Sequence, residues 1–538
     1  MRRTALITSL LFLALTPTAR AWTQRVPLPK AHGAAAGPTT TKPLRTAHGF
    51  DLVGVQWRGR ATVKIDLRAR SLSGGRWSRW APAGADGDGP DPAEAKAARA
   101  ALNTGEPLWA GRSDAVQLRL SRPVTGLRLR LIDTGKAATA RAARQPATLP
   151  LPATNAAAPA IVPRSSWDPS GRCRPTISTP GFGNVQMAFV HHTVSLNGYS
   201  RSQSAAVVLG VCLYHRDGRG WHDIGYNFLV DRYGQVFEGR AGGIDQPVVG
   251  AQAGGFNVPS TGVSMIGDFT RTAPPKVAMD ALARLLAWKL SIHGVPATGH
   301  TTVTSAGGPS TAYRAGTRVT LPRISGHRDA DLTACPGAAL YRQLPALRTR
   351  VAKLEGDVSS LSLAASASTV PYGTGLTVAG TLSPASGGEP VEIRALAEGR
   401  ERVVASALTA PDGSWSSQMP APARSSLVRA VYMGGASPGT ISNLARVEVT
   451  PVISLGAEQP GTGSVVVDGT VAPGRKAVTV TAYRGRQKVS TRRIAVRDGS
   501  FRGAIGLPAA GTYRLVATVP ADAATGAARS HSVEVQSG

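Results

Sequence analysis

Two short motifs that lie far apart in the sequence together offer the ligands of a zinc site. Phe189-Val190-His191-His192-Thr193 ends an apolar run with two histidines, and Gly326-His327-Arg328-Asp329 is followed by Thr333-Ala334-Cys335-Pro336-Gly337. Imidazole nitrogen and thiolate sulfur both bind zinc well. Neighbouring residues of a strand face opposite ways, so only one of His191 and His192 can point into a given pocket.

His, His and Cys give three protein ligands and no evident fourth. Structural zinc usually has four protein ligands, whereas catalytic zinc has three and an open position for water. The chain contains three cysteines, and if Cys173 pairs with Cys212, Cys335 is the thiol left for a metal. Each motif alone is weak evidence, because a single histidine is usually an ordinary residue and Gly-His-Arg-Asp could be a salt-bridged turn.

The segments around these motifs predict an α/β domain. Ser200 and Gln203 have the spacing of a helix capping box, which predicts a helix with Cys212 on its buried face. Residues 277–292 have a helical apolar pattern, and Pro336 is expected to open a helix that ends near Lys353. A strand is expected over residues 224–230. It would place Tyr226, from Trp221-His222-Asp223-Ile224-Gly225-Tyr226-Asn227-Phe228, just after a turn.

The rest of the chain predicts a multidomain protein. Short segments of alternating polarity before the α/β domain indicate an N-terminal all-β domain, and two C-terminal regions with repeated strands and Asp-Gly-Ser-aromatic turns indicate two immunoglobulin-like β-sandwiches. The expected order is a signal peptide (1–21), a linker (22–45), the N-terminal β-domain (46–134), a linker (135–160), the α/β domain (161–354), and sandwiches over 355–450 and 451–538.

The first residues and the charge indicate the compartment. Met1-Arg2-Arg3, the apolar stretch Leu6–Leu15 and Ala19-Arg20-Ala21 form a signal-peptide pattern, so we expect a secreted, extracellular protein. No apolar stretch is long enough for stable membrane insertion. The formal net charge of +29 favours anionic cell-wall polymers as partners, although a GC-rich genome could also produce it. Dense basic arms and stacking aromatic platforms are missing, so nucleic acid is not an expected partner.

Taken together, the motifs resemble one family. His-His-Thr, Trp-x-Asp-Ile-Gly-Tyr-Asn-Phe, Glu-Gly-Arg at 238–240, Gly-His-Arg-Asp and Thr-x-Cys-Pro-Gly occur in the order seen in peptidoglycan recognition proteins and type-2 N-acetylmuramoyl-L-alanine amidases. The resemblance covers residues 161–350. It implies a mixed sheet flanked by helices, a Zn²⁺ cofactor and peptidoglycan as substrate. The implied activity is hydrolysis of the amide between the lactyl group of N-acetylmuramic acid and L-alanine.

The same resemblance assigns roles residue by residue. The implied zinc ligands are His191, His327 and Cys335, and Tyr226 matches the catalytic tyrosine. Thr333 stands where some members have a catalytic lysine and the catalytic animal members have threonine. The implied substrate groove contains Trp221, Asn227 and Arg240.

Three other functions are compatible with parts of this pattern. One is a peptidoglycan-binding protein without turnover, although non-catalytic family members lack the cysteine ligand and this chain has Cys335. Another is a wall scaffold in which the β-domains carry the function. The third is a zinc hydrolase that acts on a different amide, because a fold alone does not define a substrate.

Overall fold

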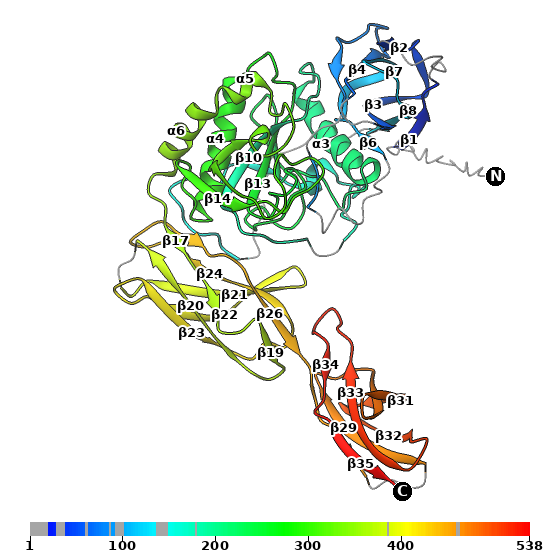
Figure 1. The fold of residues 1–538 in the computed structure, drawn as a ribbon. Helices are drawn as coiled ribbons and strands as arrows, with labels where there is room; N and C mark the ends of the chain where they lie inside the picture. The colour runs from blue at the N-terminus through cyan, green and yellow to red at the C-terminus, as the bar shows by residue number, and fades with distance from the viewer. Residues whose placement is uncertain are drawn as a thin grey trace, which may run out of the picture. The chain divides into compact units, whose positions relative to one another are not determined.

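The computed structural model describes residues 20–27, 38–59, 63–84, 88–91, 102–135, 149–177, 180–384, 387–458 and 463–538 (Figure 1). The chain forms two compact units. The first contains Met1–Pro146, Ala156–Leu290 and Pro296–Glu355, and the second contains Ala147–Asn155, Ser291–Val295 and Gly356–Gly538. Most of the predicted signal peptide, up to residue 19, lies outside the described residues. No helix in the described ranges is both long and apolar enough to cross a membrane.

An eight-stranded antiparallel sheet forms the N-terminal part of the first unit. Its order is β1-β8-β3-β7-β4-β5, with β2 paired to β7 and β6 to β3. Buried and partly buried residues alternate along β4, in line with the period-two pattern of the sequence. The strands are β1 (Arg20–Arg25), β2 (Thr39–Thr40), β3 (Leu44–Arg58), β4 (Ile65–Ser71), β5 (Ala81–Pro82), β6 (Asn103–Thr104), β7 (Leu108–Leu120) and β8 (Thr125–Asp133).

The predicted linker over residues 22–45 is wrong at both of its ends. Strand β1 pairs with β8 from Arg20 to Arg25, so the sheet begins before the linker was expected to start. Strand β2 pairs with β7, and β3 already begins at Leu44. The Pro- and Ala-rich composition of this region is typical of a linker. Two of its residues nevertheless belong to the sheet, since Trp22 packs against the sheet core and Val26 is buried in it.

The central part of the first unit is a six-stranded mixed sheet in the order β16-β10-β13-β11-β12-β9, with a separate β14-β15 hairpin. Its strands are β9 (Ile161–Val162), β10 (Met187–His192), β11 (Phe228–Val230), β12 (Val236–Glu238), β13 (Ser260–Met265), β14 (His300–Thr304), β15 (Arg318–Pro322) and β16 (Ile324–Gly326). The helices are α2 (Arg164–Trp167), α3 (Ser204–Leu213), α4 (Lys276–Ser291), α5 (Ala338–Tyr341) and α6 (Leu344–Glu355).

Most predicted elements of this domain are present, with two differences. The capping box at Ser200 forms, and α4 begins and ends one residue before the expected helix over 277–292. The expected strand over 224–230 is shorter, since β11 begins only at Phe228. Gly225 packs against the main chain of Ala251, where a Cβ would lie 2.7 Å from the carbonyl oxygen. The expected final helix is split into α5 and α6, and Pro345, the second residue of α6, suits the start of a new helix but not the interior of a longer one.

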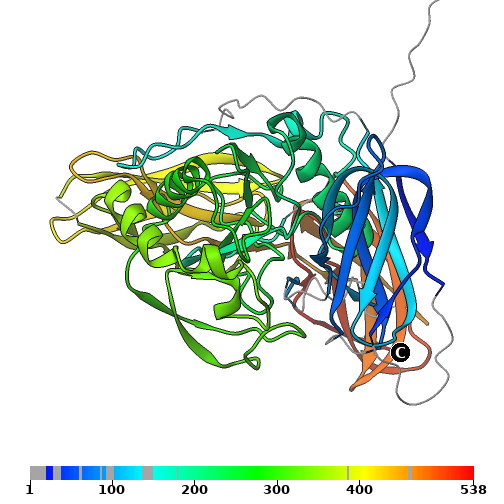
Figure 2. The same cartoon turned by 90° about the horizontal axis from the view of Figure 1, so that it is seen from above.

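Helix α3 is buried on all sides, which explains why it lacks a polar face. All of its residues are buried, from Ser204 to Leu213. One side packs on the central sheet and the other on the N-terminal sheet, whose Leu52, Trp109 and Ile132 share its hydrophobic cluster. In Figures 1 and 2 the teal segment that holds α3 lies between the blue N-terminal strands and the green central domain. The two domains of this unit therefore share the hydrophobic cluster around α3, while the N-terminal sheet also has a core of its own.

The second unit is rich in β-structure. It contains a four-stranded sheet (β17-β20-β18, with β23), a six-stranded sheet (β19-β26-β24-β21-β22, with β25) and a nine-stranded sheet (β27-β29-β32-β31-β30-β33-β34, with β28 and β35). The first two sheets enclose one apolar cluster and the third encloses another. Their strands are β17 (Ser360–Leu361), β18 (Ala364–Ala365), β19 (Thr369–Pro371), β20 (Leu376–Ser383), β21 (Pro390–Ala397), β22 (Arg400–Leu408), β23 (Ser414–Met419), β24 (Ser426–Tyr432), β25 (Thr440–Ile441), β26 (Ala445–Thr450), β27 (Val452–Ile453), β28 (Gly456–Ala457), β29 (Ser464–Ala472), β30 (Ala477–Arg484), β31 (Gln487–Arg497), β32 (Ser500–Gly506), β33 (Gly511–Val519), β34 (Ala528–Arg529) and β35 (Val533–Ser537).

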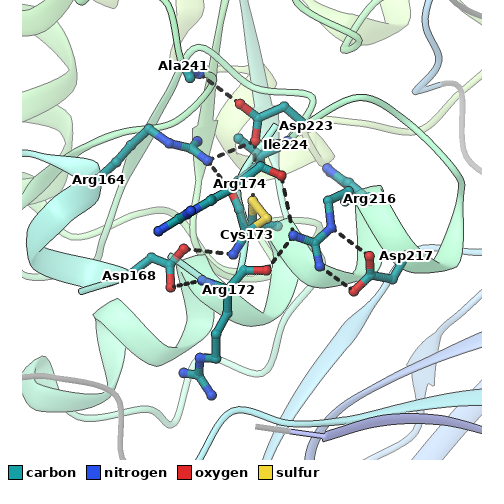
Figure 3. The surroundings of a disulfide bond; sticks show 12 residues. Arg164, Asp168, Arg172, Cys173, Arg174, Arg216, Asp217, Asp223, Ile224 and Ala241 are labelled. Carbon is teal, nitrogen blue, oxygen red and sulfur yellow. Dashed lines mark hydrogen bonds and ion pairs between the residues drawn. A yellow bond between two sulfur atoms is a disulfide. The ribbon is translucent and has the colours of Figure 1, made fainter. Parts of the chain in front are cut away.

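A disulfide between Cys173 and Cys212 ties the segment after α2 to α3 (Figure 3). Asp168 accepts hydrogen bonds from the main-chain N–H groups of Arg172 and Cys173, at 2.8 and 2.7 Å. Arg164 donates to the Cys173 carbonyl at 2.6 Å and to Asp223 at 3.0 Å. Asp223 lies three residues before Tyr226, so this network links the disulfide to the segment that carries the predicted catalytic tyrosine.

We predict that replacing both Cys173 and Cys212 with alanine lowers the free energy of unfolding of this unit by about 2–4 kcal/mol, because the unfolded chain loses a cross-link. Urea denaturation followed by tryptophan fluorescence measures the change. A thiol reductant should lower the midpoint of the unaltered protein and leave that of the double variant unchanged. Equal sensitivity of both proteins to the reductant would contradict the prediction.

Glu355, the last residue of α6, is a buried carboxyl group. Its Oε2 accepts a hydrogen bond from the Ala297 N–H at 2.8 Å, while its Oε1 has no hydrogen-bond partner among the described residues. Burial raises the pKa of Glu355 to about 7. Between the ordinary carboxyl pKa and this value, the folded protein holds a proton that the unfolded chain has released. Folding stability is therefore lost as the pH rises through that window.

We predict that Glu355→Gln removes this pH dependence. The variant should be more stable than the unaltered protein at pH 8, by up to about 3 kcal/mol, and nearly equal to it at pH 4. Thermal and urea unfolding at both pH values measure the difference. A variant that is less stable at pH 8 would show that the ionised carboxylate is accommodated.

Candidate metal centre

The three predicted zinc ligands come together at the ends of two neighbouring parallel strands. Strands β10 and β16 pair in parallel with Val190 opposite Gly326. The residue after each of these is a histidine, so the register places His191 beside His327, and their rings lie 4.5 Å apart. This edge of the sheet is where the carboxyl ends of parallel strands converge, as in other α/β sites.

Cys335 reaches the same point from the loop before α5. Its Sγ lies 3.7 Å from His191 Nδ1, and the ligand atoms of His191, His327 and Cys335 all lie within 4.8 Å of one another. Zinc–nitrogen and zinc–sulfur bonds of ordinary length place tetrahedral ligands about 3.3–3.6 Å apart. The donor set and its spacing therefore fit zinc.

Both histidines direct Nδ1 to this point because Nε2 is already bonded. His327 Nε2 lies 2.7 Å from an Asp331 carboxylate oxygen, which can only accept a hydrogen bond. His191 Nε2 lies 2.6 Å from the Gln252 amide oxygen, and the Gln252 amide nitrogen donates to Ser260. Each imidazole therefore carries its proton on Nε2 and leaves the Nδ1 lone pair for a metal. Such outer partners also fix the ring orientation.

His192 faces away from the ligand cluster. Its Nδ1 accepts a hydrogen bond from the Phe269 N–H at 3.1 Å, and burial lowers its pKa to about 4, so the ring is neutral. The His192 main-chain N–H lies 3.4 Å from the Cys335 sulfur. A donor at that distance favours the thiolate form that binds metals.

Tyr226 lies beside the ligand cluster. Its ring centroid is 5.3 Å from that of His191. Burial and the neighbouring charge of Asp88 raise the pKa of Tyr226 well above its ordinary value, so the hydroxyl stays protonated. It donates a hydrogen bond to an Asp88 carboxylate oxygen.

Asp88 is a site residue that the sequence did not predict. It comes from the N-terminal domain, yet its Oδ1 lies 3.6 Å from His191 Nδ1 and 3.2 Å from His327 Nδ1. The only signal in the sequence is an acidic stretch, Asp86-Gly87-Asp88-Gly89-Pro90-Asp91, in a basic domain.

The other predicted site residues take different positions. Thr333 is half-buried, and its hydroxyl accepts a hydrogen bond from the Cys335 N–H at 3.2 Å. Trp221 is buried beneath the Arg219 guanidinium, which lies 4.8 Å from its ring centroid. Arg240 is buried, and its main-chain N–H donates to the Tyr226 carbonyl at 2.8 Å.

Asn227 bonds to main chain through both ends of its amide. The nitrogen donates to the Val248 carbonyl and the oxygen accepts from the Gly262 N–H, each at 2.8 Å. A side chain bonded in this way holds two segments together next to the site. Each bond uses one of the two N–H donors of the amide nitrogen or one of the two acceptor positions of its oxygen.

Comparisons with known proteins match the two segments that form this site. Residues 181–338 match the sequence model of the N-acetylmuramoyl-L-alanine amidase family. Residues 14–156 match a model described as Rv3811 N-terminal galactose-binding domain-like. The first match covers the ligand cluster and the second covers the domain that supplies Asp88.

Similar curated proteins come from animals. Peptidoglycan-recognition protein SC1a of Drosophila melanogaster is 29% identical over 34% of this chain and 83% of its own length. The N-acetylmuramoyl-L-alanine amidase of Mus musculus is 32% identical over 35% of this chain, and the match spans 30% of the mouse protein. Among solved structures, Drosophila PGRP-LB is 26% identical, with a TM-score of 0.27, over 34% of this chain and 91% of that one.

The central domain therefore belongs to the peptidoglycan recognition and type-2 N-acetylmuramoyl-L-alanine amidase family. The N-terminal domain is a galactose-binding-like β-domain. The matched central segment includes His191, His327 and Cys335.

We predict that Asp331→Asn weakens zinc binding by about 10–100-fold, because an amide in place of the carboxylate no longer fixes the His327 tautomer. Competition with a chromophoric chelator measures the affinity. Asp280→Asn on α4 removes the same charge from the domain surface and should leave the affinity unchanged. Equal zinc affinity in the Asp331 and Asp280 variants would show that the Asp331 contact does not orient the ligand.

Proposed function

We propose that this chain is a zinc-dependent N-acetylmuramoyl-L-alanine amidase that hydrolyses the lactyl–L-alanine amide of bacterial peptidoglycan. One observation carries the proposal. Two Nδ1 atoms and one thiol sulfur converge, the Nε2 of each histidine is occupied by an outer partner, and a protonated tyrosine stands beside them. Three protein ligands are the number that catalytic zinc sites use.

The residues present divide the chemistry between them. Zinc bound there would activate a water molecule and polarise the amide carbonyl. Tyr226 keeps its proton and can donate to the oxygen on which negative charge develops, an interaction typically worth about 10²–10³ in rate. Thr333 holds the Cys335 main chain by accepting its N–H and has its own hydroxyl proton left to donate to the substrate carbonyl.

Substrate recognition is assigned to the surroundings of Tyr226. We propose that Trp221 and Arg240 line the groove for the stem peptide and that Asn227 supports it through its two main-chain hydrogen bonds. Peptidoglycan is the proposed partner, and the net charge of +29 suits anionic wall polymers as well. The proposed location is extracellular, at the cell wall. The C-terminal β-units are proposed to be immunoglobulin-like and to act as wall-binding or spacing modules.

A peptidoglycan-binding protein without turnover is the alternative. Binding requires a groove but no metal ligands. The buried Cys335 sulfur beside two oriented histidines has no function in that alternative, so the proposed hydrolase accounts for more of the site.

Digestion of purified peptidoglycan tests the proposal. The zinc-loaded chain should release stem peptides with a free L-alanine amino terminus, identified by mass spectrometry. Cys335→Ser and a chelator should abolish release, and Tyr226→Phe should reduce the rate by about 10²–10³. Tyr233→Phe, which loses a hydroxyl bonded to the Tyr199 carbonyl, should retain the full rate. Stem peptides that still carry a muramic acid residue would point to a different bond and overturn the proposal.

A further inference from the structure

The N-terminal domain places a carboxylate where the metal centre needs an open position. The Asp88 side chain is 2% exposed, and its Oδ1 lies 3.6 and 3.2 Å from the metal-facing nitrogens of His191 and His327. Its other oxygen accepts the hydrogen bond of Tyr226. Asp88 therefore contacts two of the three expected metal ligands and the expected catalytic tyrosine.

These distances suit metal coordination. Carboxylate oxygen binds zinc at nearly the same bond length as imidazole nitrogen, so the two atoms stand about 3.3 Å apart when they share one tetrahedral ion. The distances from Asp88 to the two histidine nitrogens lie close to that value. Asp88 does not join the group of three whose ligand atoms all lie within 4.8 Å of one another, so its carboxylate faces the metal position from the side of the two histidines. Binding of this carboxylate to the ion would bring the protein ligands to four, the number of a closed zinc site, whereas catalysis requires one position to be free.

The segment 88–91 is fixed to the central domain through Asp88, Gly89 and Asp91. Arg219 donates to the Asp88 carbonyl at 3.3 Å. Asn257 donates to the Gly89 carbonyl at 2.9 Å. Asp91 Oδ1 accepts hydrogen bonds from the main-chain N–H of Gly255 at 2.8 Å and from the amide of Asn257 at 3.0 Å.

The domain behind this segment is itself packed closely against the central domain. Strand β3 approaches Tyr214 so tightly that a Cβ on Gly54 would lie 2.0 Å from its ring. The Tyr214 hydroxyl donates to the Gly105 carbonyl at 2.9 Å, and Gln56 donates to the Gly218 carbonyl at 2.8 Å. The position of Asp88 is therefore supported by an interface with its own specific contacts.

We propose that Asp88 is a fourth, removable ligand of the metal centre, by which the N-terminal domain keeps the amidase site latent. The inference rests on the proposed zinc site. With the segment 88–91 in place, Asp88 takes the position that the attacking water needs and engages the Tyr226 hydroxyl. The site becomes active when this segment leaves, which breaks contacts of Asp88, Gly89 and Asp91 but none of the bonds that hold His191, His327 and Cys335.

Ligand access to the metal, measured by spectroscopy, tests this proposal directly. The full chain is loaded with Co²⁺, whose visible absorption reports the ligands around it, and is titrated with azide. Asp88→Ala should bind azide with a dissociation constant at least about tenfold lower than that of the unaltered chain, because apparent affinity falls with the fraction of protein whose site is open. Asp66→Asn, the same charge loss on β4 of the same domain, should behave like the unaltered chain.

Two further measurements complete the test. Asp91→Ala, which removes an anchor of the segment but no atom near the metal, should shift azide binding in the same direction by a smaller factor. Peptidoglycan release by Asp88→Ala should be at least about tenfold faster than release by the unaltered zinc-loaded chain. Equal azide binding by Co²⁺-loaded Asp88→Ala and the unaltered chain would overturn the latent-site proposal. If Asp88→Ala binds azide tightly and releases no peptide, the proposed amidase function fails and the role of Asp88 as a ligand stands.

Discussion

The parallel pairing of β10 with β16 is the constraint on which the site depends. A shift of one residue in that register would turn one histidine to the opposite face of its strand, because side chains alternate along a strand. In the observed register Val190 lies opposite Gly326, so the residues that follow them, His191 and His327, lie side by side. The Gln252 and Asp331 contacts then set the direction of each ring. The arrangement of the candidate ligand cluster thus results from one strand register and two outer hydrogen bonds.

The fold places the N-terminal domain inside the same physical unit as this cluster. Helix α3 has no solvent-facing side, since the two domains cover it from both directions. Removing the N-terminal sheet would expose that apolar surface, at a cost of about 25 cal/mol for each Å². The docked position of the N-terminal domain is therefore stabilised independently of Asp88. The segment 88–91 adds only a few hydrogen bonds to an interface that the rest of the domain already forms. The segment could therefore leave the site, as the proposal requires, without undocking the domain.

The sequence predicts the ligand cluster well because its residues belong to short motifs whose combination is typical of few kinds of site. The side-chain types of His191, His327 and Cys335 are themselves those of zinc ligands. Strand β4 could also be predicted, because burial of one face gives its sequence a period of two. The sequence does not predict Asp88, because its role arises from a contact between domains that no local pattern records. Asp331 could have been found, since it stands four residues after His327 on the same loop. The strand that contains Trp22 is not predicted because Pro- and Ala-rich composition resembles a linker.

Arg219 couples the metal centre to the proposed substrate groove. It donates to the main chain of Asp88 and of Gly105, and its guanidinium covers the ring of Trp221. An arginine with two carbonyl acceptors and an aromatic face loses much of its fixed geometry when one acceptor leaves. Departure of the Asp88 segment would therefore free the fourth metal position, release the Tyr226 hydroxyl and loosen the cover over Trp221 in one event. The residues proposed to bind the amide and those proposed to recognise the stem peptide would become available together, and a single domain contact would then control both binding and chemistry.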